Sequence, residues 1–199
     1  MNIYLLRHGE THWNRDRRLQ GLRDIPLNAT GMRQSRRLAE WHQKNGSTRV
    51  VSSPLVRARR TAQILVGPGR SALLADDRLR EIDHGPWAGM RLATIECRFP
   101  HEFATWNSCP EKFRFSNSEP LRAVYQRSTE ILKDIIGSNT KNDVAVVSHG
   151  VVNALLLCAA LGACLSRIRE FTLANAAVSV LQVRRGEIVA VQRELDVTK

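Results

Sequence analysis

Two short runs of the chain are almost continuously apolar, and they constrain its fold more than any other feature. Residues 2–6 read Asn-Ile-Tyr-Leu-Leu and residues 143–148 read Asp-Val-Ala-Val-Val-Ser. Such runs are typical of central parallel strands, which are buried on both faces. Further β-prone runs with the length of strands lie at residues 49–52, 177–183 and 188–193.

Helix signals lie between these strands. One helix is predicted from Asn28 to about Lys44, with Gly46 as the stop, and a second from Pro54 to about residues 67–69. A third helix is predicted to start at residues 118–120, and a fourth follows His149. Strands that alternate with helices indicate βα units. We therefore expect an α/β fold, a three-layer α/β/α sandwich with a mostly parallel central sheet. A turn at Gly186 predicts a closing hairpin at the edge of this sheet.

The chain shows no internal repeat and no linker rich in Gly, Pro or Ser, so we expect residues 1–199 to form a single domain. Its least regular stretch, at about residues 85–118, is of the kind that forms a lid over a site. The sequence has neither an apolar run of ~18 residues nor the features of a signal peptide. We expect a cytoplasmic protein without a membrane partner.

Four cysteines are too few and too irregularly spaced for a disulfide scaffold, so we expect reduced thiols. The net charge is +11, and 25 of the 30 basic residues are arginines, which clamp phosphate groups well. An anionic partner is therefore expected. Nucleic acid is one such partner, but the arginines are scattered and no basic tail is present. Solvated surface charge is the simpler interpretation, and we predict no nucleic-acid partner.

Chemistry is expected at the carboxyl ends of the parallel strands, where ligands bind in open α/β sheets. The first strand ends in Arg7-His8-Gly9, the second leads into residues 52–57, with Arg57 at the end, and the strand at 143–148 ends in His149-Gly150. Glycine backbone can approach an oxyanion closely, and a helix that starts after His149 can point N–H groups at it. These features predict a phosphate pocket.

Phosphoryl transfer needs positioning, positive charge and a proton for the leaving oxygen. An imidazole nitrogen can attack the phosphorus, and the resulting phosphohistidine divides one difficult displacement into two easier ones. Candidate acids lie close together at Glu81, Asp83 and His84.

Residues 5–14, Leu-Leu-Arg-His-Gly-Glu-Thr-His-Trp-Asn, closely resemble the signature of the histidine phosphatase superfamily, which includes the cofactor-dependent phosphoglycerate mutases. The resemblance continues in the family's order through residues 19–21, 24–27, Gly31, 52–62, 80–82 with 85–89, and 147–150. Separate blocks in one order are far more specific than a lone Arg-His-Gly.

By this resemblance His8 is the nucleophile that becomes phosphorylated, and Glu81 is the proton donor that later deprotonates the attacking water. Arg7, Arg57 and His149 would hold the phosphoryl oxygens. Further contacts to phosphate or substrate are expected from Asn14, Gln20, Gly21 and Gly150. The resemblance implies neither a metal nor an organic cofactor.

Several neighbouring residues allow simpler interpretations. His12 has the spacing of a helical metal ligand relative to His8 but lacks a third ligand, so we predict no metal site. Asp83 and His84 are interpreted as solvated neighbours of Glu81, and His42 and His101 as surface residues. The arginines at 15, 17, 18 and 23 either select a second anionic group or are solvated. The aromatic residues Phe99, Phe103, Trp106, Phe113 and Phe115 either pack helices or wall the substrate, with packing favoured.

The chain departs from many family members at residues 117–120, Asn-Ser-Glu-Pro, where they have a Gly-Glu-Ser turn. Only 67 residues separate Glu81 from His149, and the chain stops soon after its last strand. The family's mutases look longer, and less shielding favours water as the phosphoryl acceptor. We expect a metal-independent phosphomonoester phosphatase that acts on a small anionic phosphorylated metabolite. Phosphoglycerate mutase activity and a non-catalytic phosphate-binding domain are the alternatives. The physiological substrate and the oligomeric state, a homodimer included, stay open.

Overall fold

The computed structural model describes residues 1–45, 49–67, 72–114, 117–138 and 142–195. Its strands are β1 (Asn2–Arg7), β2 (Arg49–Ser52), β3 (Ala72–Ala75), β4 (Val144–Ser148), β5 (Val178–Arg184) and β6 (Glu187–Leu195). Its α-helices are α1 (His12–Arg15), α2 (Ala29–Asn45), α3 (Val56–Val66), α4 (Leu92–Arg98), α5 (Pro100–Ser108), α6 (Leu121–Gly137) and α7 (Gly150–Ala160). Three 3-10 helices are η1 (Asp77–Leu79), η2 (Gly85–Trp87) and η3 (Leu165–Phe171).

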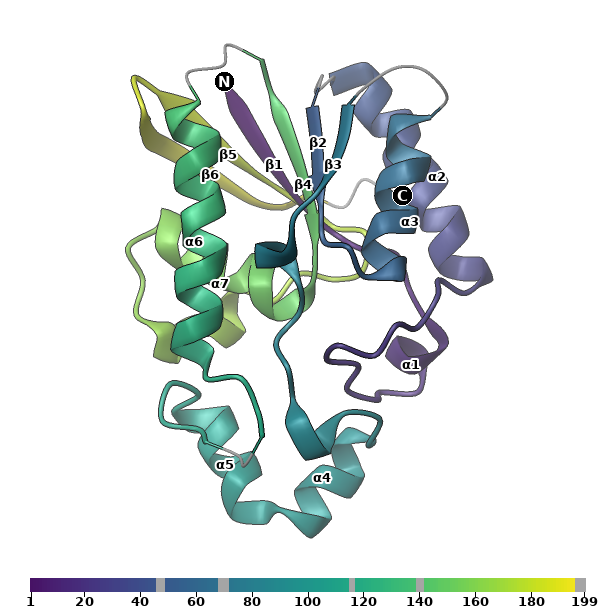
Figure 1. The fold of residues 1–199 in the computed structure, drawn as a ribbon, viewed down its shortest axis with the longest axis vertical. Coiled ribbons are helices and arrows are strands. Elements are labelled where there is room, and N and C mark those ends of the chain that lie inside the picture. The colour runs from purple at the N-terminus through teal and green to yellow at the C-terminus, as the bar shows by residue number, and fades with distance from the viewer. Residues whose placement is uncertain (46–48, 68–71, 115–116, 139–141, 196–199) are drawn as a thin grey trace.

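The six strands form one sheet in the order β3-β2-β4-β1-β5-β6. The first four strands along the chain run parallel, while β5 and β6 are antiparallel to their neighbours. Helices α6 and α7 cover one face of the sheet, and α2 and α3 cover the other (Figure 1). The predicted α/β sandwich with a mostly parallel sheet is confirmed.

Residues along β1 alternate between two hydrophobic cores. Ile3 and Leu5 pack with α6 and α7 in one core. Tyr4 and Leu6 pack with α2 and α3 in the other. All four side chains are buried, which explains why this strand lacks the polar alternation of a half-exposed strand.

The helix and hairpin predictions agree with the structure within a few residues. Helix α2 begins directly after Asn28, although its predicted stop at Gly46 lies outside the described residues. Helix α3 begins two residues after Pro54 and ends at Val66, directly before Gly67. Helix α6 begins after Pro120, and α7 begins directly after His149.

The closing hairpin joins β5 to β6 through Arg185 and Gly186, whose φ angles are 53° and 81°. Positive φ at both positions is the conformation of a type I′ turn, in which glycine carries no steric cost. The predicted hairpin at the sheet edge is confirmed.

Residues 85–114 form a lobe beyond the carboxyl ends of the parallel strands (Figure 1). The sequence prediction of an irregular stretch is wrong here, because η2, α4 and α5 occupy most of it. These short elements pack around the buried side chains of Trp87, Ile95 and Phe113. Burial of this aromatic cluster stabilises helices too short to be stable alone. A lid function for this lobe and a single domain for the whole chain stay predictions.

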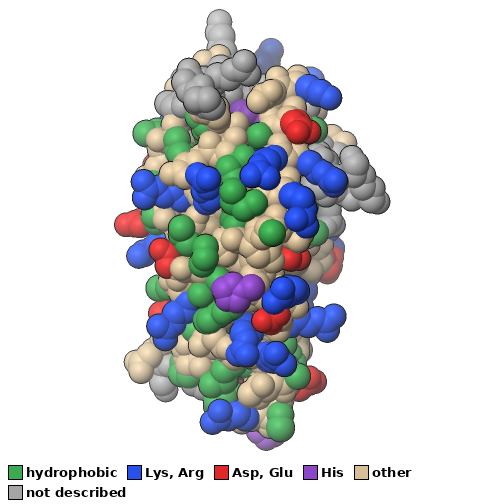
Figure 2. Space-filling view, turned by 90° about the vertical axis from the view of Figure 1, so that its right-hand side faces the viewer, with side chains coloured by type: hydrophobic (Ala, Val, Ile, Leu, Met, Phe, Trp, Pro, Cys, Tyr) green, Lys and Arg blue, Asp and Glu red, His purple; other side chains and the backbone are tan. Residues whose placement is uncertain are grey.

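Figure 2 shows the face of the molecule that lies on the right in Figure 1. Lys and Arg side chains are spread over its height, with hydrophobic and acidic side chains between them. Among the described residues, no single helix is both long and apolar enough to cross a membrane, although α7 and η3, bent by 114° relative to each other, would suffice together by length and composition.

Candidate active site

The ends of β1, β2 and β4 bring the predicted catalytic residues together. Arg7 ends β1 directly opposite Ser148, the last residue of β4, so His8 and His149 leave neighbouring strands side by side. Their rings are 5.2 Å apart between centroids, at an interplanar angle of 62°. The predicted pairing of the two histidines therefore follows from the register of two parallel strands.

The imidazole of His8 is fixed in one tautomer. Its Nδ1 lies 2.7 Å from the carbonyl oxygen of Gly9, and a carbonyl only accepts hydrogen bonds, so Nδ1 carries the proton and Nε2 carries the lone pair. The side chain is buried. Burial lowers the pKa of His8 well below its ordinary value, and the charges of Arg57 and Arg7 lower it further. His8 is therefore neutral at neutral pH, with a free nucleophilic nitrogen.

The backbone at His8 is held by contacts from three directions. Asn175 Nδ2 donates to the His8 carbonyl at 3.1 Å, and the Gly9 amide donates to Thr61 Oγ1 on α3 at 3.1 Å. On the α2 side, a Cβ at Gly9 would lie 2.5 Å from the carbonyl oxygen of Gly31. The glycine at position 9 is thus required for close backbone packing, and the approach of its backbone to an oxyanion stays a prediction.

Arg57 is fully buried and anchors the loop that carries Gln20. It donates from Nη2 to the Gly21 carbonyl at 2.9 Å and from Nη1 to the Arg23 carbonyl at 2.7 Å. Burial lowers the pKa of Arg57 to about 10, so the guanidinium stays charged at neutral pH. Arg7 donates from Nη1 to the Leu173 carbonyl.

Both arginines keep hydrogen-bond donors for a ligand. The Nε atoms of Arg7 and Arg57 are buried and have no partner among the described residues. Two fixed guanidinium groups with unused buried donors form a strong site for an anion.

His149 faces the same region from the start of α7. Its Nε2 lies 2.7 Å from Ser53 Oγ, and that hydroxyl also accepts from the Leu55 amide at 3.3 Å. We assign the hydroxyl proton to the bond with Nε2, which leaves a proton on Nδ1, a buried atom with no partner among the described residues. Burial, followed by the charge of Arg57, lowers the pKa of His149 well below its ordinary value. Neutral His149 can therefore donate to a phosphoryl oxygen from Nδ1.

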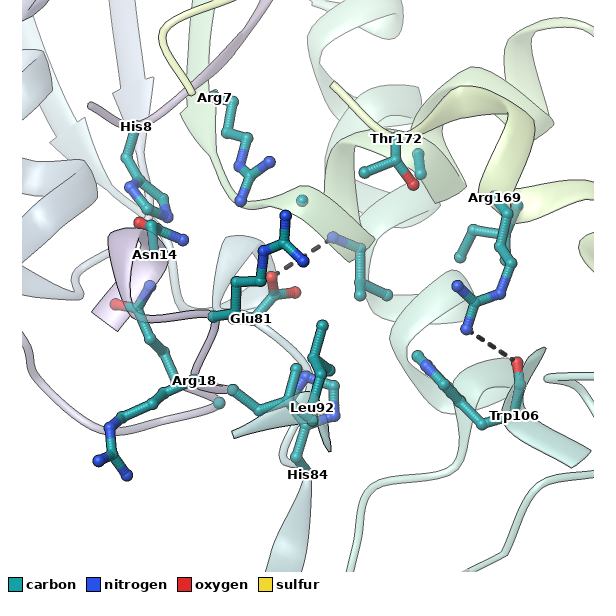
Figure 3. Close-up of a pocket in the computed structure, with 18 of the residues that line it drawn as sticks. Arg7, His8, Asn14, Arg18, Glu81, His84, Leu92, Trp106, Arg169 and Thr172 are labelled. Carbon is teal, nitrogen blue, oxygen red and sulfur yellow. Dashed lines mark hydrogen bonds between the residues drawn. The ribbon is translucent and has the colours of Figure 1, made fainter. Parts of the chain in front are cut away.

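Glu81 lies at the edge of this pocket, where two backbone amides orient its carboxylate. Oε1 accepts from the Ile82 amide at 3.0 Å, and Oε2 accepts from the Val151 amide at 3.3 Å (Figure 3). One of the first amides of α7, which the sequence assigned to an anionic ligand, is thus satisfied by Glu81. The carboxylate is held beside the phosphate pocket, at a place suited to proton transfer.

Arg127 on α6 positions the segment that carries Glu81. It donates to the carbonyl oxygens of Arg80 at 2.6 Å and Glu81 at 3.3 Å, and it forms a two-pronged ion pair with Glu119 at 2.8 and 2.9 Å. The glutamate within the unusual 117–120 segment therefore keeps a structural role. Arg127 was missed from the sequence, although an arginine beside the apolar face of an amphipathic helix is a recognisable signal.

The remaining predicted residues lie around the same cavity. Asn14 Oδ1 accepts from the Thr11 amide and hydroxyl at 3.1 and 3.0 Å, so its Nδ2 is the group left to donate to a ligand. Gln20 is buried, and its Oε1 has no partner among the described residues. Gly21 adopts a φ of 51°, the left-handed conformation that glycine tolerates.

These groups enclose a cavity of about 360 Å³. Eight of the nine predicted site residues line it: Arg7, His8, Asn14, Gln20, Gly21, Arg57, Glu81 and Gly150. His149 lies behind the lining, fully buried against His8. Within the described parts of the chain, no three His, Cys, Asp or Glu side chains gather closely enough to hold a metal ion. The roles assigned to the site residues stay predictions.

Two histidine interpretations were wrong. His84 is buried, because its ring packs edge-on against that of Trp106 in the lobe, with the ring centroids 5.8 Å apart. Burial lowers the pKa of His84. His42 is buried on α2. His101 is exposed, as predicted for a surface residue, and His12 is exposed as well. Asp83 is half-buried, and its carboxylate accepts from the Gly85 amide at 2.9 Å.

The aromatic residues satisfy both alternatives that the sequence left open. Phe113 is buried against Trp87, with centroids 4.7 Å apart, while Phe103 and Trp106 both pack in the lobe and line the cavity. Phe115 lies outside the described residues. Among the arginines near Gln20, those that line the cavity are Arg17 and Arg18.

Comparison with known proteins agrees with this geometry. The model of the histidine phosphatase superfamily (branch 1) matches residues 3–195, and the chain belongs to this family. It is 34% identical to phosphoserine phosphatase 1 of Hydrogenobacter thermophilus over 191 residues, and these residues cover 95% of this chain and 90% of the relative.

Two further similarities extend the comparison. A probable phosphoglycerate mutase of Proteus mirabilis is 32% identical over 179 residues, which cover 90% of this chain and 83% of that protein. The solved structure of Bacillus stearothermophilus YhfR superposes with a TM-score of 0.92 at 30% identity, covering 100% of this chain and 99% of that one.

Proposed function

We propose that this chain is a phosphomonoester phosphatase that works through a phosphohistidine on His8 Nε2. The observation that carries the proposal is the fixed tautomer of His8, in which Nδ1 is bonded to the Gly9 carbonyl and the lone pair is therefore on Nε2. Beside it lie two buried guanidinium groups with unused donors. A neutral nucleophile surrounded by positive charge suits attack on a phosphate dianion.

The reaction proceeds in two displacements. In the first, the lone pair of His8 Nε2 forms a bond to phosphorus, the bond from phosphorus to the ester oxygen breaks, and protonated Glu81 gives its proton to that oxygen. In the second, the Glu81 carboxylate takes a proton from water, the water oxygen bonds to phosphorus, and the phosphorus–nitrogen bond breaks. Inorganic phosphate leaves, and His8 and Glu81 return to their starting states.

Arginine, histidine and asparagine groups supply the electrostatic stabilisation in both steps. In this proposal Arg7, Arg57 and His149 Nδ1 donate to the phosphoryl oxygens, with Asn14 Nδ2 as a further donor. The cavity is lined by five arginines and one acidic residue, Glu81. This charge balance favours a small anionic phosphorylated metabolite as the substrate.

Phosphoglycerate mutase activity is the second candidate, favoured by the similarity to a probable phosphoglycerate mutase. The two activities share the phosphohistidine and differ in whether water or a substrate hydroxyl receives the phosphoryl group. A cytoplasmic location, a homodimer, and the absence of nucleic-acid and membrane partners stay predictions.

Two parallel assays test the proposal. One measures release of p-nitrophenol from p-nitrophenyl phosphate in excess chelator, and the other measures conversion of 3-phosphoglycerate in the presence of 2,3-bisphosphoglycerate. We expect chelator-resistant hydrolysis without isomerisation, loss of hydrolysis in H8A, and full activity in H12A, whose exposed histidine is the matched control. Isomerisation without hydrolysis would replace the phosphatase by a mutase, and inactivity in both assays would overturn the proposal.

A further inference from the structure

Arg169 lies across the cavity from the phosphate pocket. It belongs to η3, and Figure 3 shows it on the opposite side from His8 and Asn14, with Glu81 between them. Its Nη2 donates to the Trp106 carbonyl at 3.5 Å and to Asn107 Oδ1, both on α5. The guanidinium therefore lies at the solvent-exposed rim of the cavity, where it links η3 to the lobe.

The charge of Arg169 is not neutralised by a carboxylate within the described parts of the chain. Its two acceptors are neutral amide oxygens, whereas the nearby Arg167 pairs with Glu170 at 2.6 Å. Arg169 is an exposed residue, and partial burial of its side chain lowers its pKa. A guanidinium has five N–H donors in a planar fork, so donors remain for an anionic ligand.

Arg18 is a weaker candidate for the same role. It donates to the Gly89 carbonyl at 2.8 Å, and in Figure 3 its guanidinium points away from His8 and Glu81. Arg169 instead reaches from η3 toward Trp106 at the cavity wall.

The wall between the two basic ends of the cavity is mainly apolar. It is formed by the side chains of Leu92, Phe103, Trp106, Ala154 and Ile168. A ligand with its phosphoryl group at His8 would place an apolar body along this wall. Its far end would reach Arg169, where Asn107 and Thr172 add polar lining.

We propose that Arg169, together with Asn107 and Thr172, forms a subsite for a second anionic group of the substrate. The planar fork of arginine matches a carboxylate, so the favoured substrates are phosphomonoesters whose leaving group has an apolar body ending in a carboxylate. This inference rests on the proposed phosphatase function and adds the chemical class of the leaving group.

Two synthetic substrates of the same shape test the subsite. In 4-carboxyphenyl phosphate and 4-carbamoylphenyl phosphate the ring and the size are matched, and the far group differs in charge. The carbamoyl compound also has the slightly better leaving group, which works against the preference expected for the carboxylate. We expect kcat/KM of the wild type to favour the carboxylate by about tenfold or more, the effect of one charge-assisted hydrogen-bond pair. In R169Q this ratio should fall to near one, and in R169K it should be partly kept.

R167Q is the matched control, because it removes one positive charge from the same 3-10 helix but not from the cavity lining, and it should keep the full ratio. The ratio separates recognition of the carboxylate from a structural role, since misfolding would lower both rates together. If R169Q does not fold, the kcat/KM ratios of the wild type and of R169K decide whether the subsite recognises the carboxylate. A wild-type ratio near one, or an unchanged ratio in R169Q, would overturn the subsite while hydrolysis of both compounds still supports the phosphatase. A wild type that hydrolyses neither compound would overturn both.

Discussion

The contact between α2 and the loop after His8 can be tested by adding a single methyl group. In G31A the new Cβ would lie 2.0 Å from the carbonyl oxygen of Glu10 and 2.7 Å from its amide nitrogen. Both atoms are already held, because the Glu10 amide donates to Gln34 Oε1 at 2.8 Å and its carbonyl accepts from the Asn28 amide at 3.0 Å. The backbone of Glu10 must therefore withdraw by about 1 Å, and His8 moves with it.

This overpacking should lower the free energy of unfolding by about 3 kcal/mol, the upper end of the usual range for buried insertions. For a chain of this length, the corresponding fall in Tm is about 6–12 °C. A shift of about 1 Å at the nucleophile should also lower kcat/KM about 100-fold. Urea denaturation and p-nitrophenyl phosphate hydrolysis measure the two effects.

The matched control is G137A, at the last residue of α6, where an added Cβ meets no atom within 4 Å. This variant should be as stable as the wild type or up to about 1 kcal/mol more stable, because alanine favours helices over glycine. If G31A kept wild-type stability and activity, the argument that α2 positions the His8 loop would be refuted.

Two further predictions concern proton transfer and pH. In E81Q the proton donor is lost, so hydrolysis of alkyl phosphates should slow by about 10²–10⁴-fold. The leaving group of p-nitrophenyl phosphate departs without a proton, so only the attack of water on phosphohistidine should slow for this substrate. Stopped-flow assays should then show a burst of p-nitrophenol. A linear time course at the wild-type rate would exclude Glu81 as the acid and base. His8 and His149 have lowered pKa values when folded, so below pH ~6.5 the unfolded chain binds more protons. The buried His42 and His84, whose pKa values are also lowered, add to this effect, so stability should fall as the pH falls, by up to about 1.4 kcal/mol per pH unit for each of the four histidines. Urea titrations of H8N should show a slope smaller by about one such contribution, and equal slopes would contradict the assignment.

The alternation of core residues in β1 could be predicted because the strand is buried on both faces, which leaves a continuous apolar run in the sequence. Strand β3 could not be predicted from the sequence. Its residues, Ala-Leu-Leu-Ala, contain no β-branched side chain, and Leu74 is exposed. Pairing with β2 supplies the strand with its structure, so only the tertiary context distinguishes it from a loop.

The centre of the candidate site could be predicted for a similar reason. His8, Arg57 and His149 each follow a strand within a few residues, and parallel strands bring their carboxyl ends to one edge. Residues that act from other elements carried no such signal. Asn175, for example, reaches the His8 carbonyl from 167 positions away in the chain.

His84 shows the opposite error. Its neighbours Glu81 and Asp83 suggested a solvated segment, but the lobe covers the ring with Trp106. Burial that depends on another part of the chain cannot be predicted from the charge of adjacent residues.

The central claim is that His8 Nε2 becomes phosphorylated, and trapping the intermediate tests it most directly. The enzyme is mixed with ³²P-labelled p-nitrophenyl phosphate, quenched in base, where phosphohistidine survives, and digested to locate the label. We predict label on the peptide that contains His8, more of it in E81Q because water attack is slowed, and none in H8N. Turnover without labelled protein, or label on His149 in its place, would contradict the account.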